Sequence, residues 1–169
     1  MGNFIRNQIP RNQLFEFDAN MAILPVSSPA EAISRNEHLL VAYDDSIVEN
    51  TIYHGVMSRD YNAGNILIDL HWISATATSG DVVWAAAFER IADRGHDIDV
   101  DSFAEQINTT ATTNDTSGIV KKTTIVLTQA QADLIKTNDA FRIRIQRLAT
   151  DERDTMIGDA QLLRVSGGQ

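Results

Sequence analysis

The stretch over residues 65–91 constrains the fold of this chain more than any other part of the sequence. Apolar residues recur at every second position over residues 65–73, and again over residues 81–91. A period of two places successive side chains on opposite faces of an extended backbone, so both segments predict strands. Ser79 and Gly80 predict a turn or short loop between them. Each strand is expected to lay an aromatic-rich face on a core.

Strand patterns recur along the rest of the chain. They cover residues 14–26, 31–34, 38–43, 49–57, 121–127, 140–148 and 160–165. The only helix signal is residues 129–135, with Thr128 as the expected cap. About eight strands separated by polar loops, with almost no helix, predict an all-β sandwich or barrel. The sandwich that best fits eight strands is a jelly roll.

Length, charge and composition exclude several classes of function. A chain of 169 residues fits one domain with tails, and the net charge of −9 argues against nucleic acid as a partner because an acidic body repels phosphates. No apolar run approaches the roughly 18–20 residues that span a bilayer, and the amino end lacks the pattern of a signal peptide. We therefore expect a soluble protein made in the cytoplasm, with no membrane partner. The lack of cysteine excludes disulfides and thiolate nucleophiles.

Residues 1–13 differ in composition from the rest of the chain, because they carry two arginines and no acid. They form either a frayed terminus or an extended arm that becomes ordered only on another subunit or surface. On the second interpretation, the predicted partner-binding residues are Phe4, Ile5, Arg6, Ile9 and Arg11. The predicted organisation is an N-terminal arm over residues 1–20, a jelly-roll β-sandwich domain over residues 21–166 and a C-terminal tail over residues 167–169.

Asp97, Asp99 and Asp101 form the most suggestive polar cluster. On an extended chain they would share one face, where a row of carboxylates can bind a hard cation such as calcium. An EF-hand loop, however, would place Gly at Ser102 and Glu at Asn108. A solvated strand face or loop is therefore the favoured interpretation, and we predict no metal and no other cofactor.

No other pattern predicts catalysis. The four histidines (His38, His54, His71 and His96) lack metal-ligand spacing, and no serine lies in a GxSxG motif. Glu49, Asp69, Glu89 and Asp101 could each serve in glycoside hydrolysis, but nothing in the sequence selects two of them. The prediction is that the protein is not an enzyme.

Three arginines and two tryptophans could each bind a ligand or instead stabilise the fold. Arg142, Arg144 and Arg147 could contact an anion, but arginines in an acidic protein more often pair with carboxylates opposite them. Trp72 and Trp84 could stack on sugars, but both fall in the register of the core-facing residues. In each case the structural interpretation is favoured.

Three runs of the sequence resemble a known family. These are LHWISATATSGDVVWAAAFERI, DIDVDSFAE and FRIRIQRLATDERDTMIGDAQLLRV, within residues 65–165. They are similar to the pattern of tailed-bacteriophage jelly-roll virion structural proteins, of which capsid cement or decoration proteins are the nearest kind. The resemblance implies a homotrimer on the capsid surface of the virion, with the major capsid protein as its partner, and it carries no catalytic residues.

The leading hypothesis is therefore a capsid cement protein that stabilises the capsid, with avidity from three arms. The alternative is a carbohydrate- or receptor-binding module of a phage tail fibre or spike. That alternative would use exposed loop aromatics, for which Tyr61 and Phe103 are the candidates.

Overall fold

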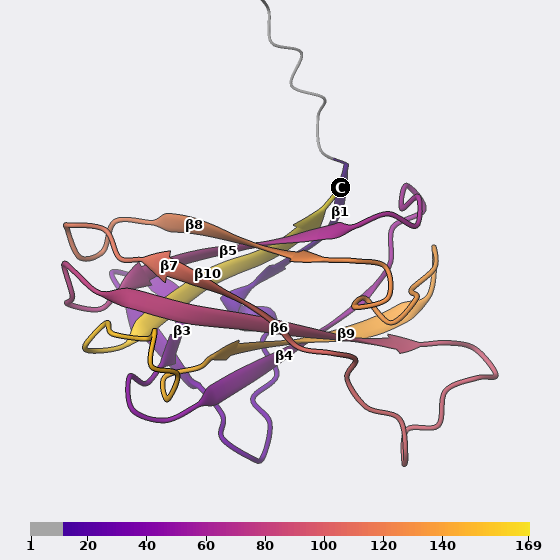
Figure 1. The fold of residues 1–169 in the computed structure, drawn as a ribbon, viewed down its shortest axis with the longest axis horizontal. Coiled ribbons are helices and arrows are strands. Elements are labelled where there is room, and N and C mark those ends of the chain that lie inside the picture. The colour runs from indigo at the N-terminus through magenta and orange to yellow at the C-terminus, as the bar shows by residue number, and fades with distance from the viewer. Residues whose placement is uncertain (1–11) are drawn as a thin grey trace, which may run out of the picture.

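The computed structural model describes residues 12–169, which form two antiparallel sheets packed face to face (Figure 1). Sheet A contains β1 (Gln13–Asp18), β2 (Glu31–Arg35), β3 (His38–Tyr43), β5 (Ile66–Ser74), β8 (Lys121–Leu127) and β10 (Ala160–Gly168). Sheet B contains β4 (Glu49–Val56), β6 (Asp81–Ile91), β7 (Ile107–Thr112) and β9 (Ala140–Arg147). The short 3₁₀ turn η1 (Ala19–Met21) follows β1. No helix in the described part of the chain is long and apolar enough to cross a membrane.

The strand order is that of a jelly roll, as the sequence predicts. In sheet A the order is β2-β3-β10-β5-β8, and in sheet B it is β4-β9-β6-β7. The strands β3, β10, β5 and β8 thus face β4, β9, β6 and β7, and the chain crosses between sheets at most connections. β2 extends one edge of sheet A, and β1 lies along β10 beyond the end of β3.

The two segments that organise the sequence lie in opposite sheets. β5 belongs to sheet A and β6 to sheet B, so the connection that ends at Gly80 crosses the sandwich. Trp72 and Trp84 meet across the interior with ring centroids 5.8 Å apart, and both are buried. The indole N–H of Trp72 donates to Thr123 Oγ1 at 2.9 Å. The prediction that both tryptophans anchor the core is confirmed.

Part of the segment expected as an arm is a strand of the sandwich. β1 pairs with β10, and Phe15 and Phe17 are buried in an aromatic cluster of the core. Phe15 lies opposite Gly167, where an added Cβ would come within 2.2 Å of its ring, so this pairing needs glycine. The predicted C-terminal tail over residues 167–169 is largely part of the sheet, because β10 extends to Gly168. In the structure, the sandwich therefore begins at Gln13 and includes Gly168.

Two local predictions were wrong. Residues 129–135 make one helical turn rather than a helix. The Thr128 hydroxyl does accept from the Gln131 backbone N–H at 3.3 Å, as expected of a cap. Asp133 and Leu134 then take positive φ angles of 54° and 51°, which end the turn. β7 was missed, because its Thr- and Asn-rich sequence has the composition of a loop.

Candidate partner-binding surface

The predicted binding residues Phe4, Ile5, Arg6, Ile9 and Arg11 lie outside the residues that the structure describes. The structure does show the contacts of the segment that follows, which begins at Asn12. The backbone N–H of Gln169 donates to the Asn12 carbonyl at 3.2 Å, directly before β1. β1 and the C-terminal end consequently lie side by side at one end of sheet A (Figure 1).

A groove of about 420 Å³ opens on the outer face of sheet A. Its apolar lining is Leu39, Val120 and Leu163, and its polar lining includes Asp18, Glu37 and Arg164. Leu39 and Val120 are exposed, at 56% and 51%. We call this hollow the sheet A groove.

A β-bulge in β10 shapes the sheet A groove. Leu162 pairs with Trp72 and Arg164 pairs with the adjacent His71, so Leu163 is an extra residue on β10. A bulge re-aims side chains, and here the consecutive residues Leu163 and Arg164 both line the groove. In a regular strand, successive side chains point to opposite faces, so one of these two would have pointed into the core. A smaller hollow of about 330 Å³ adjoins the groove and shares Leu163 and Val120 with it.

The charged side chains at the sheet A groove include one arginine that contacts two carboxylates. Arg164 Nε lies 3.0 Å from Asp18 Oδ1, and Arg164 Nη1 lies 3.4 Å from Glu16 Oε1. Burial lowers the pKa of His71, and this effect outweighs the opposing effect of the Asp69 carboxylate. The groove is therefore an apolar strip bordered by charged side chains, an arrangement that is common in protein interfaces.

The aspartate cluster lies in a turn rather than on a strand face. The Asp101 carboxylate accepts from the Asp97 N–H at 2.6 Å, and the Asp97 carboxylate accepts from the Asp99 N–H at 3.0 Å. Two of the carboxylates thus satisfy the backbone of their own loop. Across residues 12–169, no group of three or more His, Asp or Glu side chains is arranged to hold a metal ion.

The loop over residues 92–106 folds back on the outer face of sheet B through a histidine clasp. His96 Nε2 lies 3.2 Å from Glu89 Oε1, and His96 Nδ1 lies 3.0 Å from Asp101 Oδ2. The His96 side chain is largely buried, and Arg142 binds the other Glu89 oxygen at 2.6 Å. We call Glu89, His96 and Asp101 the His96 clasp.

The four carboxylates considered for glycoside hydrolysis do not form an open catalytic pair. Glu49 lies in sheet B, whereas Asp69 lies in sheet A. Glu89 and Asp101 meet at His96, but the Glu89 side chain is 2% exposed and paired with Arg142. A substrate has no access to Glu89 in this arrangement.

The arginines of β9 have three different environments. Arg142 pairs with Glu89 on the strand opposite it, as the sequence predicts. Arg147 is instead fully buried, in an ion pair with Asp154 of the loop that follows β9. Within the described chain, Arg144 has no carboxylate within salt-bridge distance. Its Nη2 donates only to Gln106 Oε1, at 3.3 Å.

The aromatic candidates for sugar binding differ in exposure. Tyr61 is buried, and its hydroxyl donates to the Gly64 carbonyl at 3.0 Å. Phe103 is half-buried, and its ring lies over the guanidinium carbons of Arg142 and Arg144 at 4.7 and 4.8 Å. In residues 12–169, every other Phe, Tyr and Trp is in the core.

Comparisons with known proteins show similarity to solved structures and not to a family model or curated protein. No protein-family model matches the sequence, and no curated protein matches it. Among solved structures, the chain is similar to a family 11 carbohydrate-binding module from Clostridium thermocellum in complex with a β-1,3-1,4-mixed-linked tetrasaccharide. The two are 10% identical with a TM-score of 0.45, and the match covers 99% of this chain and 92% of the module.

Proposed function

We propose that this chain is a structural virion protein of the capsid decoration kind, which acts as a homotrimer and binds the major capsid protein at the capsid surface. The observation that best supports the proposal is the sheet A groove. Leu39 and Val120 expose apolar surface beside Leu163, and charged side chains flank them. Exposed apolar patches bordered by polar residues are typical of protein interaction sites.

The arm adds a second contact in this proposal. Phe4, Ile5 and Ile9 supply apolar side chains, and Arg6 and Arg11 supply positive charge. This segment precedes β1, which is fixed to sheet A because Phe15 and Phe17 are buried in the core. Three copies in one trimer would present three arms and three grooves, so that weak contacts add through effective concentration.

The sugar-binding alternative has less support from the aromatics. Sugar recognition by stacking needs an exposed ring face, and Tyr61 is buried. Phe103 remains as the one partly exposed ring among the described residues.

Co-sedimentation with purified capsids that lack the protein tests the proposal. Deleting residues 1–11 keeps β1 intact and should leave a folded trimer that no longer decorates particles. The double variant Leu39→Asp/Val120→Asp should also lose binding, because it places two charges in the sheet A groove. Val126→Asp is the matched control, since Val126 is 47% exposed on β8 of the same sheet and does not line the groove.

Two results would contradict the proposal. Equal capsid binding by the truncated protein would show that the arm makes no contact. Equal binding by the groove variant and by Val126→Asp would remove the sheet A groove from the interface. Light scattering of the intact protein checks the trimer directly.

A further inference from the structure

A second hollow, of about 430 Å³, lies on the outer face of sheet B and is built on adjacent strands. Its lining includes Ser27, Asn50, Ile52, Phe103, Arg144 and Gln146. Ile52 lies opposite Arg144, and Asn50 lies opposite Gln146, in the pairing of β4 with β9. We call this hollow the Arg144 pocket.

The charge in the Arg144 pocket lacks a counterion within the described chain. On the β6 side, Arg142 lies opposite Glu89, whereas Arg144 lies opposite Ala87. The sheet therefore supplies a carboxylate to one arginine and a methyl group to the next. Burial lowers the pKa of Arg144, and the neighbouring charge of Arg142 adds to this effect. A bound anion would offset both the desolvation of the Arg144 guanidinium and its repulsion by Arg142.

The remaining walls suit a ligand with hydroxyl groups and an apolar face. Asn50 and Gln146 place two carboxamides side by side. The Asn50 NH2 group donates to the carbonyls of Ser27 at 3.1 Å and Ser28 at 2.8 Å, so Asn50 offers its oxygen as an acceptor, whereas Gln146 can donate and accept. Phe103 and Ile52 add apolar surface. The walls are fixed in advance, because Asn50 bonds to the Ser28 carbonyl through its backbone N–H at 2.9 Å and its side chain at 2.8 Å.

We propose that the Arg144 pocket binds a carboxylate-bearing sugar residue, a uronate of an acidic polysaccharide. The guanidinium of Arg144 would hold the carboxylate, the carboxamide of Gln146 and the side-chain oxygen of Asn50 would bond the hydroxyls, and Ile52 with the edge of the Phe103 ring would contact the C–H groups. This inference does not depend on the capsid role. A decoration protein with such a pocket would also attach the particle to an acidic surface glycan.

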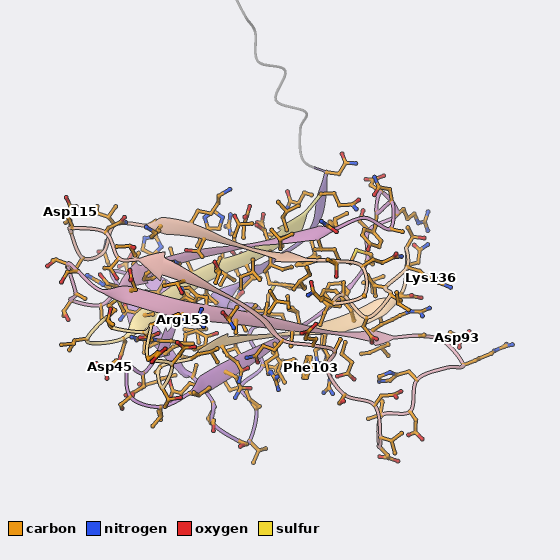
Figure 2. The ribbon with its side chains drawn as sticks, viewed as in Figure 1. Asp45, Asp93, Phe103, Asp115, Lys136 and Arg153 are labelled. Atoms are coloured by element: carbon orange, nitrogen blue, oxygen red, sulfur yellow. The ribbon has the colours of Figure 1, made fainter. Side chains whose placement is uncertain are left out.

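Calorimetric titration of the full-length protein with a galacturonic acid trisaccharide tests the inference. Measurable binding is expected, with little or none for a galactose trisaccharide of the same length. Arg144→Gln should weaken binding about 10- to 100-fold, because it removes a charge-assisted hydrogen-bonding group. Arg153→Gln is the matched control, since it removes the same charge from the loop after β9, and Arg153 lies apart from Phe103 in Figure 2.

A second variant covers the case in which Arg144→Gln does not fold. Gln146→Glu places a carboxylate beside Arg144 and should abolish uronate binding through competition and repulsion. Any of three results would overturn the inference. The first is no binding of the uronate at about 10 mM ligand. The second is equal binding of the neutral trisaccharide, or of triglutamate, which carries carboxylates but no sugar. The third is an equal loss of affinity in Arg153→Gln.

Discussion

Arg147 and Asp154 form an ion pair that is buried on both sides, with side-chain exposures of 0% and 1%. Arg147 Nη2 lies 2.8 Å from Asp154 Oδ1, and Nε lies 3.1 Å from Oδ2. The guanidinium also donates to the carbonyls of Tyr43 at 3.3 Å, Met156 at 2.6 Å and Gly158 at 2.8 Å. Arg147 therefore joins three residues of the connection from β9 to β10, Asp154, Met156 and Gly158, to the end of β3.

Breaking this pair should cost more stability than any surface substitution. Arg147→Met and Asp154→Asn each leave a buried partner without its counter-charge, and we expect a loss of about 3–5 kcal/mol in the free energy of unfolding. Urea denaturation followed by tryptophan fluorescence measures it. Arg153→Gln removes an exposed ion pair nearby and should cost less than about 1 kcal/mol. Similar losses for the two arginine variants would show that burial is not the cause.

The turn before β6 should depend strictly on glycine. Gly80 has φ +95°, and an added Cβ would lie 2.7 Å from Met156 Cα and 2.8 Å from the Thr155 carbonyl oxygen. Gly80→Ala is therefore expected to cost about 2 kcal/mol or more, because the substitution strains the backbone and displaces its neighbour. At Gly95 an added Cβ meets nothing within 4 Å, so Gly95→Ala should be close to neutral in the same thermal melt. Equal costs at both positions would refute the steric argument.

The His96 clasp should control how easily the 92–106 loop opens. His96→Ala removes the contacts to Glu89 and Asp101, so the loop should detach while the core remains folded. Trypsin cleavage after Arg94, whose side chain is 91% exposed, measures this opening and should accelerate severalfold. His54→Ala on β4 is the control, since His54 is exposed. Unchanged cleavage in His96→Ala would show that other contacts hold the loop.

The strands of this fold were more predictable than its loops. β6 and β8 have the bounds that the sequence predicts. In β8 the period of two follows the alternation of buried and less buried residues, whereas β6 is buried from Val82 to Glu89, so that its signal is its apolar composition. The Arg144 pocket and the sheet A groove were not predictable in the same way. The groove depends on a bulge at Leu163, and the pocket depends on which residue lies opposite Arg144. Both are matters of strand register, which hydrophobic periodicity alone does not determine.

The resemblance motifs also gain a physical explanation. Gly80 of the first run packs on the backbone of Met156 in the last run. Arg147 and Asp154, both in the last run, hold that segment in place. These residues therefore serve packing between loops, and the sequence could show the motifs but not the contacts that join them.

Two carboxyl groups at one end of the sandwich, Asp159 and Glu49, should destabilise the fold at neutral pH, and this contribution should disappear as the pH falls toward their ordinary pKa values of about 4. Burial raises the pKa of Asp159, and the carboxylates of Asp44 and Asp45 add to the effect. Burial also raises the pKa of Glu49. Because the folded state binds these protons more tightly than the unfolded state, ionisation of both groups destabilises the fold at neutral pH, and protonation on acidification removes that cost.

Asp159→Asn tests this pH dependence. The variant lacks the destabilising charge, so it should be more stable than the parent at pH 7. The difference should shrink as the pH falls toward the ordinary aspartate value of about 4, where the parent is protonated as well. Thermal melts of both proteins between pH 4 and 7 measure it, with Asp115→Asn as a control for the loss of one exposed charge. A gain that is independent of pH, or equal in Asp115→Asn, would assign the effect to net charge rather than to the buried position of Asp159.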